Sequence, residues 1–359
     1  MGKKYLANEE TIRSIVNNTQ NQLKTTEKLK IVDIPNKISK HWQYNNLSKM
    51  LAGKNVSKIE NNTTIMGNYA FYNASSLITA SFPNCTNVGD YAFCICSRLT
   101  SISFPECVTI GDYGFSLCRI LPSVDFPKCT SLGKYAFHNN YSLNTINFPV
   151  CETIGELAFN GCSKLMSAYF PKCTNISVSA FQGCSSLTEI NFPVCTYIPT
   201  HAFQRCSQLT NIILPECINI NGGAFASCSS LSILNLPKCI NIGANAFGQC
   251  TNLTNVSIPE CVELGSSAFT YCSTLSIINL PKCEILYNAA FSRCATLTKI
   301  ILETSTVCAL KHSNAFSSTP IASKKGYIYV PASLVDSYKK ATNWTYFATQ
   351  ISAIENMTE

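Results

Sequence analysis

The stretch LTSISFPECVTIGDYGFSLCRI, residues 99–120, is one copy of a unit that recurs every 22 residues. The proline of its Phe-Pro-x-Cys segment recurs without a shift in register at Pro83, Pro105, Pro127, Pro149, Pro171, Pro193, Pro215, Pro237, Pro259 and Pro281. A marker phenylalanine, usually preceded by alanine, recurs at the same period at Phe71, Phe93, Phe115, Phe137, Phe159, Phe181, Phe203, Phe225, Phe247, Phe269 and Phe291. Eleven copies at one fixed period predict a solenoid.

Each copy contains the pattern of one short strand. Ile102 and Phe104 are two residues apart and should point inward, while Ser101 and Ser103 point outward. Pro105 should end the strand because proline cannot donate to the hydrogen-bond ladder. The following GDYGFSLC predicts a turn and a single helical or 3₁₀ turn that closes the coil. Since leucine stands six residues after the marker phenylalanine in all eleven copies, stacked copies should form continuous apolar rows.

Composition and charge narrow the class of protein. Apolar residues make up 46% of the 359 residues and charged residues 13%, yet no run approaches the roughly 18 apolar residues of a membrane span, so we expect no membrane insertion. Residues 1–58 carry 11 basic and 4 acidic side chains, residues 59–302 carry 11 and 12, and residues 303–359 carry 5 and 4. The repeats therefore lack the basic stripe of a nucleic-acid-binding solenoid, and we expect no nucleic-acid partner.

The pattern predicts three parts. Residues 1–58 are expected to form an N-terminal attachment module with an amphipathic helix over 8–23 and a connector. Residues 59–302 form the solenoid of 22-residue repeats. Residues 303–359 form a degenerate last repeat and a cap, with a strand in YIYVP, a helix in SLVDSYKKATNW capped by Ser333, and a final apolar segment, YFATQISAI. The N-terminus lacks the apolar core of a secretory signal.

The 21 cysteines fall on two lines. Ten follow the proline by two residues: Cys85, Cys107, Cys129, Cys151, Cys173, Cys195, Cys217, Cys239, Cys261 and Cys283. Nine follow the marker phenylalanine by three: Cys96, Cys118, Cys162, Cys184, Cys206, Cys228, Cys250, Cys272 and Cys294. Only Cys94 and Cys308 stand apart. Equal register spreads thiols along a line, whereas a metal needs them at one point, so we expect small buried side chains, free thiols and no metal.

The run LTSISFPECVTIGDYGF and its ten relatives resemble the BspA-type, or Treponema-type, leucine-rich repeats over about residues 59–317. The resemblance implies an α/β repeat solenoid, a right-handed leucine-rich-repeat superhelix with a parallel β-sheet, a short helical N-terminal module and an α+β C-terminal cap. It also implies a binding or adhesive role, with no catalytic residues to transfer.

The two ends resemble a narrower group. ANEETIRSIVNNTQNQL followed by TEKLKIVDIPNKIS is similar to the leader modules of phage and prophage tail-associated proteins, although Ile34-Pro35 departs from the commoner Met-Pro. GYIYVPASLVDSYKKATNWTYFATQISAI is similar to the cap of the same repeat proteins. This resemblance implies attachment to virion or tail proteins through the N-terminal module.

Catalytic chemistry is not indicated. The four histidines, His41, His138, His201 and His312, are scattered, without a serine, cysteine or carboxylate repeatedly placed near them. No phosphate-binding loop is present, and no cofactor is expected. The protein is therefore predicted not to be an enzyme.

The outward rows of the strands offer the candidate site. In mid-array they bring acids, amides and the row's only aromatic onto successive strands, at Asp125, Asn147, Tyr169, Glu189 and Asn191. Such side chains suit a carbohydrate or a polar protein surface, with Tyr169 as the anchor. The alternative is that they only solvate the sheet and discourage edge aggregation.

The function predicted first is a non-enzymatic, tail-associated virion protein that recognises a bacterial surface glycan or protein. The alternative is a BspA-like adhesin or protein-interaction solenoid at the bacterial cell surface. Self-association into a homo-oligomer is left open by the sequence.

Overall fold

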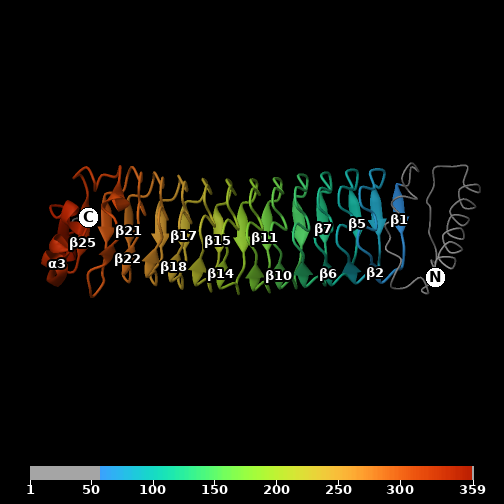
Figure 1. Ribbon diagram of the computed structural model, residues 1–359, viewed down its shortest axis with the longest axis horizontal. Coiled ribbons are helices and arrows are strands. Elements are labelled where there is room, and N and C mark those ends of the chain that lie inside the picture. Colours follow the sequence, from blue (N-terminus) through green and yellow to red (C-terminus); the bar gives the residue numbers. More distant parts are fainter. Residues whose placement is uncertain (1–56, 358–359) are drawn as a thin grey trace, which may run out of the picture.

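The computed structural model describes residues 57–357, which form a solenoid of short strands stacked along its long axis (Figure 1). We call each 22-residue copy a rung. Each rung supplies a three-residue strand just before its Phe-Pro or equivalent pair and a two-residue strand a few residues after it. The predicted leucine-rich-repeat solenoid with a parallel sheet is confirmed.

The three-residue strands pair in parallel with a constant offset of one rung; for example, Ser167 lies opposite Glu189. They are β1 (Lys58–Glu60), β3 (Thr79–Ser81), β5 (Ser101–Ser103), β7 (Ser123–Asp125), β9 (Thr145–Asn147), β11 (Ser167–Tyr169), β13 (Glu189–Asn191), β15 (Asn211–Ile213), β17 (Ile233–Asn235), β19 (Asn255–Ser257), β21 (Ile277–Asn279) and β23 (Lys299–Ile301). Their hydrogen bonding divides them into the groups β1-β3-β5, β7-β9, β11-β13-β15, β17-β19 and β21-β23, the last continuing into the cap.

The two-residue strands form a second parallel array that the sequence pattern did not predict. They are β2 (Ile65–Met66), β4 (Asn87–Val88), β6 (Thr109–Ile110), β8 (Ser131–Leu132), β10 (Thr153–Ile154), β12 (Asn175–Ile176), β14 (Tyr197–Ile198), β16 (Asn219–Ile220), β18 (Asn241–Ile242), β20 (Glu263–Leu264), β22 (Ile285–Leu286) and β24 (Ala309–Leu310). The second residue of each is buried and the first lies nearer the solvent.

The segment around the marker phenylalanine is a hydrogen-bonded turn, so the predicted helical or 3₁₀ turn is wrong. Tyr113 and Leu117 flank Phe115 with φ of 57° and 61°, and such left-handed residues cannot continue a right-handed helix. The N–H groups of these three residues instead donate to carbonyl groups of the next rung at 2.7–2.8 Å. The turns thus form a third rung-to-rung ladder, which satisfies their backbone groups.

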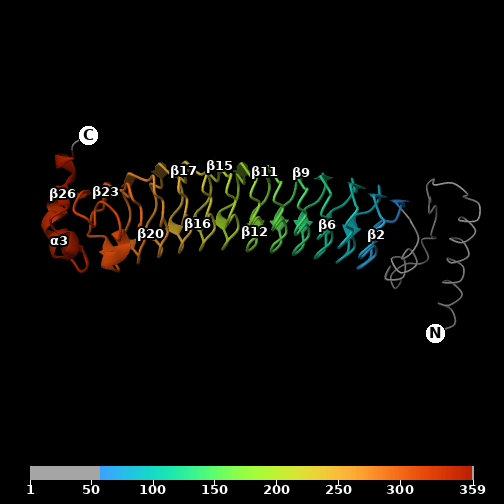
Figure 2. The ribbon, with the colours of Figure 1, turned by 90° about the horizontal axis from the view of Figure 1, so that it is seen from above.

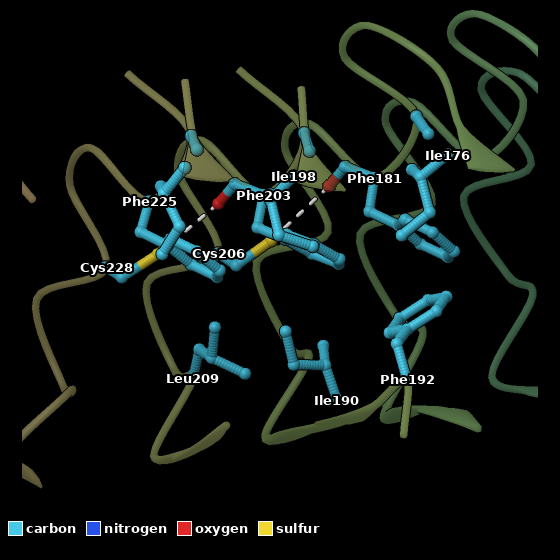
Figure 3. Packing of buried hydrophobic residues seen from close by; sticks show 14 of the residues in the cluster. Ile176, Phe181, Ile190, Phe192, Ile198, Phe203, Cys206, Leu209, Phe225 and Cys228 are labelled. Atoms are coloured by element: carbon cyan, nitrogen blue, oxygen red, sulfur yellow. Dashed lines mark hydrogen bonds between the residues drawn. The ribbon is translucent and has the colours of Figure 1, made fainter. Parts of the chain in front are cut away.

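The core consists of rows of buried side chains that stack from rung to rung between these arrays (Figure 3). The marker phenylalanines stack from Phe71 to Phe316, with neighbouring ring centroids 5.0–6.1 Å apart. A second row, from Phe82 to Phe192, packs against them and continues as leucine and isoleucine from Leu214 onward. The leucines predicted to form a row, from Leu77 to Leu297, are all buried.

The C-terminal cap closes the array (Figure 2). It comprises the 3₁₀ helix η1 (Ser313–Phe316), β25 (Tyr327–Val330), η2 (Ala332–Leu334), α3 (Val335–Lys340), η3 (Trp344–Phe347), β26 (Ile351–Ala353) and η4 (Ile354–Asn356). Strands β25 and β26 extend the sheet beyond β23, and the Trp344 indole donates to the Cys308 carbonyl at 2.7 Å.

Ser333 does not cap α3, because η2 occupies residues 332–334 and the cap position, Leu334, makes no side-chain bond. The N-terminal helix predicted over 8–23 lies outside the described residues, so the division at residues 58 and 302 stays a prediction. In the part of the chain that the structure describes, no helix has the length and apolar character needed to cross a membrane.

Candidate binding surface

The candidate residues lie on the outward side of the three-residue strands, which we call the strand face. Asp125 ends β7 and Asn147 ends β9, and both are exposed. The Asn147 amide donates to a carboxylate oxygen of Asp125 at 2.8 Å. This pair therefore offers a carboxylate and an amide in fixed relative positions.

Tyr169, Glu189 and Asn191 lie on the next two strands, β11 and β13. Tyr169 pairs in register with Asn191, and the residue is 58% exposed. Glu189 is exposed, whereas Asn191 is half-buried between the rungs of Tyr169 and Ile213. The Asn191 carboxamide oxygen is covered and accepts no hydrogen bond from the described residues. The structure thus places all five predicted residues on one face, in two adjacent groups.

The strand face becomes more apolar toward the C-terminus. Ile233 and Ile277 are exposed at equivalent positions two rungs apart, and Tyr327 follows two rungs later in the register. Asn255 and Lys299 occupy the rungs between them. With neighbouring strands about 4.8 Å apart, exposed apolar side chains recur at about 9.6 Å along this part of the face.

The cysteines have a structural role that includes hydrogen bonding. All 21 are free and buried. Cys206 and Cys228 each donate from Sγ to the carbonyl oxygen of the marker phenylalanine one rung earlier, at 3.3 Å (Figure 3). Burial raises the pKa of the Cys162 and Cys250 thiols to about 12, so these thiols are protonated and poorly nucleophilic at neutral pH.

Asn140 stands where the second cysteine line would have a cysteine, three residues after Phe137. It therefore shows which hydrogen bond this position has to make. Its amide donates to the Phe115 carbonyl at 3.0 Å, the bond that cysteine makes in neighbouring rungs. Asn140→Ala should lower the free energy of unfolding by about 1–3 kcal/mol, since a buried acceptor loses its donor. Asn140→Cys should cost less, because a smaller donor is restored. Equal denaturant midpoints for Asn140→Ala and the parent would contradict this role.

Residues 57–357 contain no metal-binding cluster and no group of histidines arranged for catalysis. No group of three or more His, Cys, Asp or Glu side chains there could hold a metal ion. His138 packs edge-on against Tyr135, His201 lies against Gly223, and His312 Nδ1 accepts the backbone N–H of Asn314. Each histidine in this part of the chain therefore has its own separate surroundings.

A stack of tyrosines in the first four rungs was missed by the sequence analysis. Tyr69, Tyr91, Tyr113 and Tyr135 occupy one position, two residues before successive marker phenylalanines. Their neighbouring ring centroids are 4.8, 4.5 and 4.5 Å apart, with planes within 8°. All four have φ between 55° and 58°, a conformation that costs a bulky residue about 1–3 kcal/mol. The sequence pattern that could have revealed this stack is the recurrence of tyrosine every 22 residues.

Parallel short strands, hydrogen-bonded ladders of turns and stacked apolar rows define a leucine-rich-repeat solenoid. The model of the BspA type leucine rich repeat region matches residues 6–109, 86–210, 130–243 and 218–332. The chain therefore belongs to the BspA-type leucine-rich-repeat family.

The chain is similar to solved leucine-rich-repeat structures, the first of which agrees with this fold. A leucine-rich repeat protein from Bacteroides ovatus is 23% identical, with a TM-score of 0.57, over 83% of this chain and 84% of that one. A leucine rich cell surface protein from Faecalibacterium prausnitzii is 25% identical, with a TM-score of 0.48, over 81% of each chain. No curated protein matches the chain.

Proposed function

We propose that this chain is a non-enzymatic binding protein of the surface or interaction type, and that its partner contacts the strand face. Membership in the BspA-type family supports this general role, since leucine-rich-repeat solenoids generally mediate adhesion or protein interactions. The proposed site comprises Asp125, Asn147, Tyr169, Glu189 and Asn191.

The observation that carries the proposal is the contrast between the rows of the repeats. The marker phenylalanine and the leucine six residues later are the same in all eleven copies, because each copy must fill the same core. At one strand-face position the copies instead carry Ser103, Asp125, Asn147, Tyr169 and Ile213. The scaffold therefore does not dictate these side chains, and they are free to match a partner.

Exposed apolar side chains on the same face argue against a purely solvating role. Ile233 is 59% exposed, Ile277 is 45% exposed, and Tyr169 belongs to the same face. Single exposed apolar residues are ordinary, but a series aligned along one face is typical of an interaction surface. We expect the polar part around Asp125 and Asn147 to contact hydroxyl or amide groups and the isoleucines to contact an apolar surface.

The experiment is a binding assay with the folded, fluorescently labelled protein on whole bacterial cells and on isolated cell-wall glycans. Tyr169→Ala should weaken binding about tenfold or more, as expected for an exposed aromatic anchor. Asn191→Ala should also weaken binding while costing little stability, because its amide oxygen already lacks a partner.

Tyr271→Ala is the matched control, because Tyr271 lies in a turn, where its ring packs under the Arg293 guanidinium at 4.8 Å. Its binding should equal that of the parent. Full binding by both strand-face variants would move the site to the turns, the caps or the two-residue strands.

Cell-surface location fits this proposal better than the virion location predicted from the ends. The family match supports the repeat part of that prediction, and neither it nor the similar structures supports a phage tail role. Residues 1–56, which carry the leader resemblance, lie outside the described residues. Flanking tail, holin or lysin genes would favour the virion hypothesis, whereas their absence would favour a cellular surface protein.

A further inference from the structure

The tyrosine stack lies in the turn segments of the first four rungs, apart from the strand face. Tyr69 ends the stack and is exposed, and Tyr91, Tyr113 and Tyr135 are half-buried beside it. Tyr72 lies across its edge, tilted by 67° to Tyr69. From the fifth rung on, the position holds Leu157, Ser179, His201, Gly223, Asn245, Ser267 and Ala289, so the stack is confined to one end of the solenoid.

The backbone does not explain why tyrosine is used here. All these positions have positive φ, a conformation that glycine and asparagine adopt most readily, and later rungs use Gly223 and Asn245. Tyrosine thus adopts an unfavourable backbone conformation in four successive rungs. Strain of this kind is a reason to look for a role of the side chain itself.

The geometry matches the needs of phenol coupling. The Tyr91 and Tyr113 rings are parallel within 8° and their centroids are 4.5 Å apart, so the two ring faces lie against each other. Partial burial and the neighbouring phenols of Tyr135 and Tyr91 raise the pKa of Tyr113. Two phenoxyl radicals formed on neighbouring rungs would therefore already be in contact.

We propose that Tyr69, Tyr91, Tyr113 and Tyr135 form an oxidative cross-linking site, at which a haem peroxidase with hydrogen peroxide joins neighbouring rungs through dityrosine. Each phenol loses one electron and one proton to the peroxidase. The two radicals couple between ring carbons ortho to the hydroxyls, and the two hydrogens on those carbons shift to the oxygens. Two tyrosines and one hydrogen peroxide thus give one dityrosine and two waters.

Such a link would covalently join neighbouring rungs, which no disulfide joins. The cysteines are buried and free, whereas the tyrosines reach the surface, so a peroxidase-generated oxidant can act on the phenols first. Because each link bridges consecutive rungs, it would restrain the N-terminal end of the repeat array against separation.

The test oxidises the full chain with a haem peroxidase and hydrogen peroxide at a concentration where it is monomeric. Dityrosine fluorescence, gel mobility and mass spectrometry of cross-linked peptides then locate the bonds. We expect links within the monomer, at Tyr69–Tyr91, Tyr91–Tyr113 or Tyr113–Tyr135, each with the loss of two hydrogen atoms. Tyr91→Phe should leave only the Tyr113–Tyr135 link, and Tyr113→Phe only the Tyr69–Tyr91 link.

The double variant Tyr91→Phe/Tyr113→Phe keeps the rings stacked but should lose the dityrosine within the monomer. Circular dichroism checks that it is folded. The control Tyr169→Phe/Tyr346→Phe removes two more exposed phenols and should leave the internal links unchanged. The proposal is overturned if the double variant cross-links like the parent, or if bonds form only between molecules through Tyr169 and Tyr346.

Discussion

Phe203→Ala is expected to lower the free energy of unfolding by about 3–5 kcal/mol. The ring is fully buried between Phe181 and Phe225, with centroids 5.3 Å away on each side. The surrounding rungs cannot close the cavity, because the Phe203 N–H bonded to the Ala224 carbonyl at 2.8 Å helps to fix their spacing. Urea denaturation followed by circular dichroism measures the loss.

Leu187→Ala in the neighbouring row should cost about 2–5 kcal/mol by the same reasoning. Because repeats are coupled mainly to their neighbours, either variant is expected to populate partly unfolded forms. Phe203→Leu serves as the conservative control and should cost less than Phe203→Ala. Parent-like denaturation midpoints for both alanine variants would contradict the packing of the rows.

The second large effect is unfolding in alkali. An unfolded chain releases thiol protons above about pH 8.5. Burial raises the pKa of Cys129, Cys173 and Cys239 in the folded chain to about 12. The folded state therefore holds more protons between these values, and its stability falls as the pH rises.

One pH unit above the unfolded pKa, each such thiol costs about 1.4 kcal/mol of stability. Several thiols together exceed the roughly 5–15 kcal/mol that stabilises an ordinary domain. We therefore expect circular dichroism to record cooperative unfolding between about pH 9 and 11. A far-ultraviolet spectrum unchanged at about pH 11 would contradict the burial of the cysteine lines.

Thiol titration at neutral pH gives an independent check. Denatured without reductant, the protein should show close to 21 reactive thiols, because all are free and buried when folded. The native protein should react far more slowly. Finding most cysteines paired would instead require a different arrangement of the two lines.

Strands in which every second side chain points into the core were predictable from the sequence. Ile102 and Phe104 mark their strand because alternate residues face the core. The strand Thr109–Ile110 was not predictable in this way, since two residues with one inward side chain have no period. The turn was misread because tyrosine and leucine at Tyr113 and Leu117 hide a left-handed backbone that glycine or asparagine would have signalled.

For the candidate site, the sequence could predict only which face of the solenoid its residues lie on. Alternation placed Asp125, Tyr169 and Glu189 outward, and the structure puts them there. The alternation could not predict that the Asn191 carboxamide oxygen is covered, because that depends on side chains from the adjoining rungs. The tyrosine stack was visible as a period, but its exposure and ring contacts depend on the turn geometry.

Blocking the strand face tests the central claim most directly. Ser167→Arg places a long charged side chain beside Tyr169 on β11, and Asn252→Arg places the same group on an exposed turn of a later rung. Both proteins should fold like the parent. Measured on bacterial cells that the parent binds, Ser167→Arg should lose binding and Asn252→Arg should keep it. Equal binding by the two variants would contradict recognition through the strand face.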